Sequence, residues 1–130
     1  MAIKVGSDSL AAGIDETAAA RAAACLFRGM GDASRVAILR HLLLGEHKVA
    51  DLTAHLGLAQ STVSKHLACL RDCGLVSSTP QGRASMFALA PGVPVDELMA
   101  AAELVLMATG AAAGSCATVA PRDSATAGVN

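Results

Sequence analysis

Two cysteines four residues apart are the side chains of this sequence best suited to binding a metal ion. Cys69 and Cys73 have the spacing of neighbours on one helix surface, because residues i and i+4 lie one above the other. Thiolates favour soft or thiophilic metals. Cys116 is a candidate third ligand, because it lies among Gly, Ala and Ser residues that give no reason to bury a thiol. The alternative is that Cys69 and Cys73 are small apolar side chains packed under a neighbouring helix.

The remaining cysteine and the histidines are predicted to have structural roles. Cys25, beside Leu26 in an Ala-rich segment, is interpreted as core filler, and His66 as a packed or hydrogen-bonded side chain at a helix flank. The other three histidines show no spacing typical of a shared metal site; they are His41, His47 and His55.

Polar side chains two turns before the cysteine pair have the pattern of a DNA-reading helix. With about 100° per residue, Ser61 and Lys65 point away from the apolar face of the same segment, which is formed by Val63, Leu67 and Leu70. Short donors and acceptors near a helix N-terminus reach base edges, and a cation reaches phosphate. The alternative is a solvated face capped by Ser and Thr. The predicted DNA contacts are Gln60, Ser61, Thr62, Ser64, Lys65 and, at a hairpin tip, Arg83.

The elements that must position these residues are short helices followed by a hairpin. Apolar periodicity and Gly stops predict helices over 15–30, 32–44, 49–56 and 60–73, with Ser61 and Thr62 as possible caps of the last. Residues 75–79 and 84–90 are predicted strands, and a final helix over 95–108 offers Leu98, Val105, Leu106 and Met107 as apolar contacts. The fold class is therefore mainly α with a β-hairpin wing, a winged helix-turn-helix. The predicted organisation is a flexible lead (1–14), one domain (15–108) and a flexible tail (109–130).

Composition sets limits on partners and compartment. The net charge of −1 gives no electrostatic argument for nucleic acid, and the 53% hydrophobic content includes only two aromatic residues. No stretch has the roughly 18 uncharged apolar residues that a membrane span needs, so we expect a cytoplasmic protein without a membrane partner. Four cysteines in a reducing compartment are expected to be thiols, metal ligands or core residues rather than disulfides. No arrangement of catalytic residues or phosphate-binding loop indicates an enzyme or an organic cofactor.

The order and spacing of several segments resemble the ArsR/SmtB family of metal-responsive repressors over roughly residues 20–108. The segments are Asp32–Leu39, Val49–Leu52, Ser61–Arg71, Gly74–Val76 and Gly82–Arg83. The resemblance implies a homodimer with the first and last helices at the interface, and double-stranded operator DNA as partner. The Cys-x-x-x-Cys pair with a C-terminal Cys is similar to the cadmium- and lead-sensing CmtR branch. That likeness implies Cd(II) or Pb(II), with Zn(II) as a further candidate, at Cys69, Cys73 and a Cys116 from the other subunit.

Three functional hypotheses follow. The first is a repressor that binds its operator when metal-free and dissociates when Cd(II) or Pb(II) binds the thiolates. The second keeps DNA binding but makes the thiols a redox or reactive-sulfur switch. The third is a thiol-rich metal-buffering or interaction protein that does not bind DNA.

Overall fold

The first two helices both begin at an aspartate cap. The computed structural model describes residues 15–110. Helix α2 spans Glu16–Met30, and the backbone N–H of Ala18 donates to Asp15 at 2.7 Å. Helix α3 spans Ala33–Leu42, with Asp32 accepting from the N–H groups of the next turn at 2.8 and 3.1 Å. Both boundaries agree with the sequence prediction, because an Asp at the N-cap satisfies donors that have no partner within the helix.

The next two helices form a helix-turn-helix. Helix α4 spans Val49–Leu56 and α5 spans Gln60–Asp72. Gly57 ends α4 in the left-handed conformation, at φ 68°, which favours glycine. The predicted caps Ser61 and Thr62 are wrong: Ala59 is the N-cap of α5, and no side-chain hydrogen bond caps the helix. The hydroxyls of the first turn are therefore not used to cap α5.

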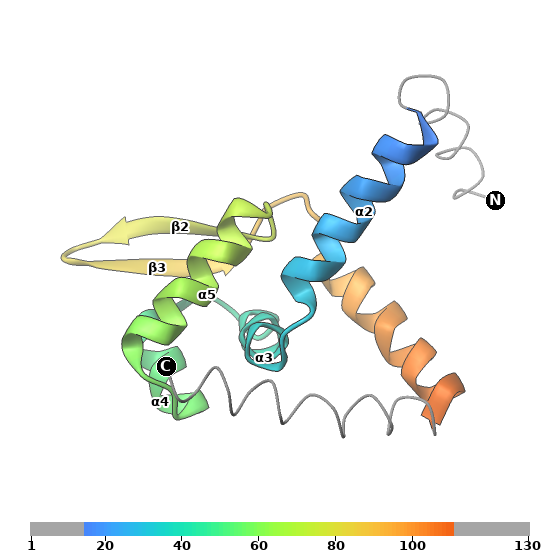
Figure 1. Ribbon diagram of the computed structural model, residues 1–130. Helices are drawn as coiled ribbons and strands as arrows, with labels where there is room; N and C mark the ends of the chain where they lie inside the picture. The colour runs from blue at the N-terminus through green and yellow to red at the C-terminus, as the bar shows by residue number, and fades with distance from the viewer. Residues whose placement is uncertain (1–14, 111–130) are drawn as a thin grey trace.

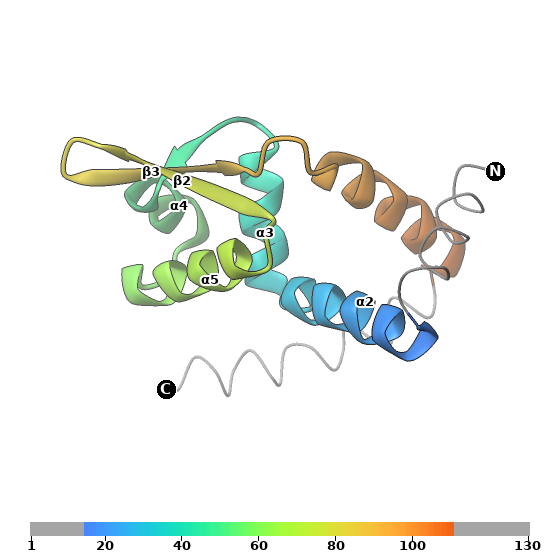
Figure 2. The ribbon, with the colours of Figure 1, turned by 90° about the horizontal axis from the view of Figure 1, so that it is seen from above.

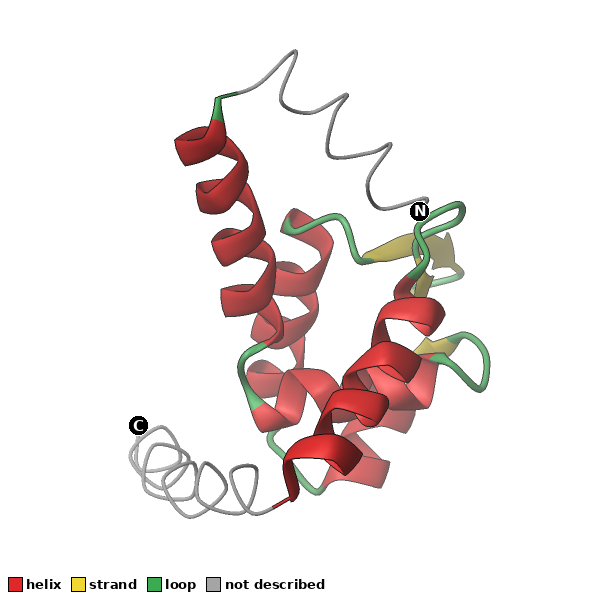
Figure 3. Ribbon diagram, turned by 90° about the vertical axis from the view of Figure 1, so that its right-hand side faces the viewer, coloured by secondary structure: helices red, strands yellow, loops and turns green. Residues whose placement is uncertain are grey.

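A small antiparallel sheet forms the wing. Strands β2 (Val76–Gln81) and β3 (Ala84–Leu89) pair from Val76↔Leu89 to Gln81↔Ala84, leaving a two-residue loop of Gly82 and Arg83. The positive φ of 65° falls on Gly82, as a II′ turn requires at its first central position. A third strand, β1 (His47–Lys48), was not predicted; it pairs with β3 and gives the order β1-β3-β2. Figure 3 shows this sheet beside an otherwise helical chain.

The core lies where α3, α4 and α5 pack on one another and on the sheet. Its fully buried members include the predicted apolar face of α5, and all have relative exposures of 1% or less: Ile38, Leu39, Leu52, Val63, Leu67, Leu70 and Val95. Figures 1 and 2 show that the first turns of α5 and the tip of the hairpin lie on one side of the molecule. Helix α2 and the last helix project from the opposite side.

The last helix, residues 95–110, contacts the core only through its first turns. Val95 and Met99 are buried, at 1% and 8% exposure, whereas residues 100–110 are all exposed. Val105, Leu106 and Met107, which were expected to offer apolar contacts, do not contact the core of this chain: they are 60%, 53% and 79% exposed. Among residues 15–110 they form an exposed apolar surface. Within residues 15–110, no helix has both the length and the apolar character that crossing a membrane requires.

Candidate functional site

The polar face of α5 is presented to solvent as its periodicity predicts. Gln60, Ser61, Ser64 and Lys65 are exposed, and Thr62 is half-buried, while the opposite face of the helix is in the core. Because no side chain caps α5, its first backbone N–H groups and its hydroxyls remain available to acceptors such as phosphate oxygens.

The wing places a cation on the same side of the molecule. Arg83 occupies the second position of the two-residue loop between β2 and β3 and is exposed. Figures 1 and 2 show the hairpin tip and the N-terminal end of α5 on a common side. The structure thus brings the loop that carries Arg83 to the side of the molecule on which α5 begins.

Arg35 of α3 connects the end of α2 to the middle of α5. Its Nε donates to the carbonyl of Gly29, its Nη2 donates to the carbonyl of Arg28 at 3.3 Å, and its Nη1 lies 3.3 Å from Nδ1 of His66. The two carbonyls belong to the last turn of α2, and that of Arg28 also accepts from the backbone N–H of Gly31 at 3.1 Å. One guanidinium therefore fixes α5 relative to α2.

His66 is packed and hydrogen-bonded, as its position at the flank of α5 predicts. Its side chain is 16% exposed, and Nε2 lies 3.8 Å from Oδ1 of Asp32. Because the guanidinium of Arg35 can only donate, Nδ1 acts as the acceptor and the neutral ring carries its proton on Nε2. Burial lowers the pKa of His66, Asp32 raises it, and Arg35 lowers it further.

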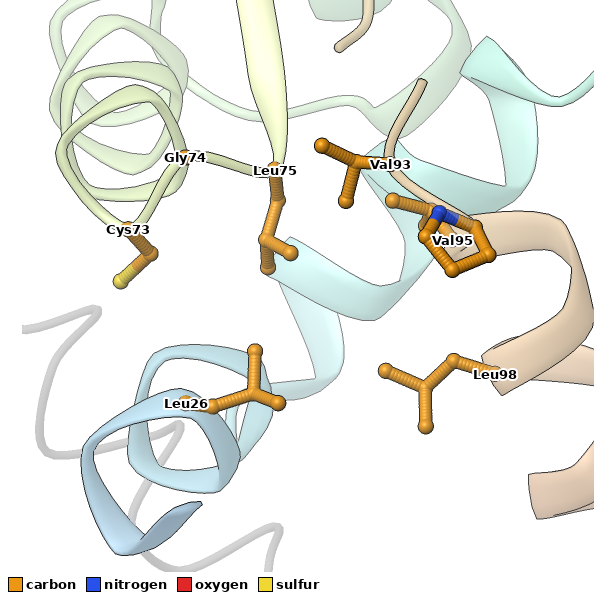
Figure 4. A pocket seen from close by; sticks show the side chains of 8 residues that line it. Leu26, Cys73, Gly74, Leu75, Val93, Val95 and Leu98 are labelled. Atoms are coloured by element: carbon orange, nitrogen blue, oxygen red, sulfur yellow. The ribbon is translucent and has the colours of Figure 1, made fainter. Parts of the chain in front are cut away.

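The cysteine pair lies at the contact between α5 and α2. Cys69 and Cys73 are both half-buried, and a Cβ placed at Gly29 would be only 2.6 Å from Sγ of Cys73. The thiol therefore packs directly on a glycine, and Figure 4 shows it pointing from α5 toward α2. Burial raises the pKa of Cys73, and the neighbouring Cys69 and Cys25 thiols raise it further, while Arg35 opposes them.

Cys25 is not core filler. It is exposed on α2, one turn before Gly29, and is close enough to Cys73 to affect its pKa. Periodicity within the Ala-rich α2 could not reveal this, because only the packing of α2 on α5 decides which face of α2 is covered. Cys116 lies outside the described residues. Within residues 15–110, no group of three His, Cys, Asp or Glu side chains is arranged to hold a metal ion.

Two further features were not predicted. A pocket of about 430 Å³ lies between α2, the end of α5 and the last helix, lined by apolar side chains and the Cys73 thiol (Figure 4). The packing of α3, β1 and α4 also brings together His41, His47 and His55, whose ring centroids are 5.0 to 6.3 Å apart. The histidines lie 6 and 8 residues apart along the chain, so no pattern within a single helix or strand indicates this cluster.

A helix-turn-helix followed by a two-stranded wing, with an exposed polar face on its second helix, defines the winged helix-turn-helix class of DNA-binding proteins. Residues 32–78 match the family described as "Bacterial regulatory protein, arsR family". A probable mercury resistance operon repressor of Streptomyces lividans is 37% identical over 95 residues, which are 73% of this chain and 74% of that protein. The chain belongs to the arsR family of bacterial transcriptional regulators.

Two further relatives refine the comparison. The HTH-type transcriptional regulator CmtR of Mycobacterium tuberculosis is 51% identical over 69 residues, or 53% of this chain. The match spans 58% of the length of CmtR. The homodimeric winged helix-turn-helix domain of Mb0332 from Mycobacterium bovis has a TM-score of 0.64 at 26% identity, covering 72% of this chain and 85% of that domain. Mb0332 is described as a possible ArsR-family transcriptional regulator.

Proposed function

We propose that this chain is a homodimeric repressor that binds operator DNA when metal-free and dissociates when Cd(II) or Pb(II) binds Cys69, Cys73 and Cys116. The observation that carries the proposal is that one helix, α5, holds both the exposed reading face and the cysteine pair. A change at the thiols is therefore a change in the element that contacts DNA.

DNA reading is assigned to the first two turns of α5 and to the wing. Lys65 and Arg83 are exposed cations on a common side of the molecule, and Ser61, Ser64 and Gln60 are exposed beside Lys65. Hydroxyl and amide groups read base edges in the major groove, while cations and helix N-terminal N–H groups bind phosphate. Thr62, which is half-buried, completes the set at the edge of this face.

Dimerisation is assigned to the apolar side chains that a single chain leaves exposed. Leu104, Val105 and Met107 of the last helix are 67%, 60% and 79% exposed, and Phe27 of α2 is 58% exposed. Apolar surface of this extent marks a site of association. Both helices project from the side opposite to the reading face, so two subunits joined there leave both reading helices uncovered. The homodimeric state of the Mb0332 domain supports this arrangement.

The donor set fits a thiophilic ion. Cys69 and Cys73 are near neighbours, and the raised pKa of Cys73 keeps its thiol protonated in the metal-free protein. Such a thiol reacts slowly with oxidants, because the thiolate is the nucleophile, whereas a metal ion displaces the proton on binding. Two thiolates leave coordination positions open, and a third ligand must come from beyond residues 15–110 or from the other subunit. Cys116 is the one cysteine of the sequence that lies outside residues 15–110.

Release of DNA requires two dimer geometries, one that contacts the operator and one that does not. The ion must bind the second geometry more tightly than the first. Cys73 rests on Gly29, and Arg35 ties the same end of α2 to His66 in the middle of α5. Bonds from the pair to Cys116 would therefore act where α5 meets the dimerisation helix. A coupling of about 1–3 kcal/mol, typical of allosteric proteins, lowers operator affinity about 5- to 150-fold.

The experiment is a metal titration under strict reduction, using the chain's own promoter DNA and fluorescence anisotropy. The wild type should release DNA as a sulfur-to-cadmium charge-transfer band develops. Cys116→Ser should bind DNA with unchanged affinity and respond poorly to Cd(II), while the matched control Cys25→Ser should respond as the wild type. An unchanged Cd(II) response in Cys116→Ser would refute the three-thiol site. Release by hydrogen peroxide but not by Cd(II) would favour the redox alternative, and a chain that never binds the promoter would favour metal buffering.

A further inference from the structure

The three histidines that the fold brings together belong neither to the polar face of α5 nor to the cysteine pair. His41 is near the end of α3, His47 begins β1, and His55 is near the end of α4. The ring centroids are 5.0 Å apart for His41 and His55, 6.1 Å for His47 and His55, and 6.3 Å for His41 and His47. The cluster thus contains one imidazole from each of three separate elements.

These separations are close to those of a metal centre. Two imidazoles on a tetrahedral ion have centroids about 5 Å apart, because the ion lies about 2 Å from each ring nitrogen. The centroids of His41 and His55 have this spacing in a stacked arrangement, with 20° between the ring planes, and the two other pairs must approach by about 1 Å. The described residues contain no preformed three-ligand group, so the rings must also turn to direct their nitrogens at one point. His55 is exposed, and His41 and His47 are half-buried, which leaves the rings room to turn.

One ring already has the orientation that ligating histidines use. Nδ1 of His47 lies 2.8 Å from the carbonyl oxygen of Gly45. A carbonyl oxygen can only accept, so Nδ1 carries the proton, and Nε2 of the neutral ring is left with its lone pair. Metal-binding histidines commonly donate their second ring N–H to a backbone carbonyl in this way, which fixes the tautomer.

We propose that His41, His47 and His55 form a second metal site, selective for imidazole-preferring divalent transition ions such as Zn(II), Ni(II) or Co(II). Neutral imidazole suits these ions, whereas the thiols of the α5–α2 contact suit softer ones. An ion held here would link α3, α4 and β1. Because β1 pairs with β3 through His47↔Phe87 and Lys48↔Met86, the ion would also brace the base of the wing.

The test separates this site from the thiols by replacing all four cysteines with serine in the full-length chain. Co(II) titration should then give one bound ion per chain, with ligand-field bands and no sulfur-to-cobalt charge transfer. Each of His41→Gln, His47→Gln and His55→Gln should weaken binding by at least about tenfold, the loss caused by removing even an outer-shell partner. His66→Gln is the matched control and should leave Co(II) binding unchanged. Zn(II) should raise the Tm of the cysteine-free chain and not that of the three variants.

Three results would overturn the proposal: no stoichiometric Co(II) binding, a loss produced by only two of the three substitutions, or an equal loss from His66→Gln. Far-UV circular dichroism checks that the cysteine-free chain is folded. If it is not, the wild-type chain under reduction serves instead, with NMR of the imidazole rings. Excess Zn(II) should then shift the resonances of all three clustered rings and leave those of His66 in place, and unshifted cluster resonances would refute the site.

Discussion

The contact between Gly29 and Cys73 allows a quantitative test of how α2 and the thiol pair are joined. A Cβ at position 29 would lie 2.6 Å from Sγ of Cys73, well inside the about 3.5–4.0 Å of a favourable contact. In Gly29→Ala the thiol must therefore move by about 1 Å or change rotamer. Overpacking of this kind typically destabilises by about 1–3 kcal/mol. Replacing a helical Gly by Ala contributes at most about 1 kcal/mol in the opposite direction.

The net expectation for Gly29→Ala is a loss of about 0–3 kcal/mol in the free energy of unfolding. In a Cys73→Ala background the clash is absent, because the new Cβ would lie 3.7 Å from the Cβ of residue 73, an ordinary contact. There the same substitution should stabilise by up to about 1 kcal/mol. The double-mutant cycle should thus give a coupling energy of about 1–3 kcal/mol.

Urea unfolding of the four proteins, reduced, metal-free and at one protein concentration, measures this coupling. Fixed concentration is needed because the stability of a dimer depends on it. Gly29→Ala should also weaken Cd(II) binding, since it displaces one thiol of the proposed site while leaving the reading face of α5 unchanged. Additive effects, within about 0.5 kcal/mol, together with unchanged Cd(II) affinity would refute the contact.

Three further predictions concern the reading face, the His66 contact and the dimer surface. Lys65→Gln should reduce the salt dependence of operator binding. The magnitude of the slope of log binding constant against log salt concentration should fall by about 2 for a dimer with one phosphate contact per subunit. Arg71→Gln, at the other end of α5, should leave this slope unchanged. Because the pKa of His66 is lowered in the folded protein, the stability that its neutral ring contributes should be fully present above the unfolded pKa of 6.5 and should be lost as the pH falls below that value. His66→Gln should flatten this part of a Tm-against-pH profile, and an unaltered profile would contradict the assignment. Val105→Glu with Met107→Glu should shift the chain from dimer to monomer in analytical ultracentrifugation without loss of helix content, and a persistent dimer would place the interface elsewhere.

Features within a single element could be predicted from the sequence. Asp32 caps α3 and Gly57 ends α4 because capping depends on residues within one turn of the helix end. The apolar face of α5 and the adjacency of Cys69 and Cys73 follow from the same helical period, which requires no knowledge of the other elements. The wing was recognisable because two β-prone runs flank a turn.

The errors also have local causes. Ser61 and Thr62 were predicted as caps from residue type alone, but α5 begins at Gln60 and its N-cap is Ala59. Val105 and Met107 were expected to make apolar contacts, but the sequence did not indicate with what, and the last helix leaves the core after Met99. Apolarity predicts that a side chain will be covered, but it does not say whether its own chain or a second copy covers it.

The sequence by itself therefore determined the order of the helices, the reading face and the thiol pair, because each depends on side chains within a few residues of one another. Tertiary structure alone decided that Cys25 lies near Cys73, that Gly29 receives the thiol, and that the three histidines of α3, β1 and α4 share one cluster. These contacts join elements whose relative positions are set by the common core. Helical and strand periods describe the faces within an element, whereas packing decides which faces of different elements meet.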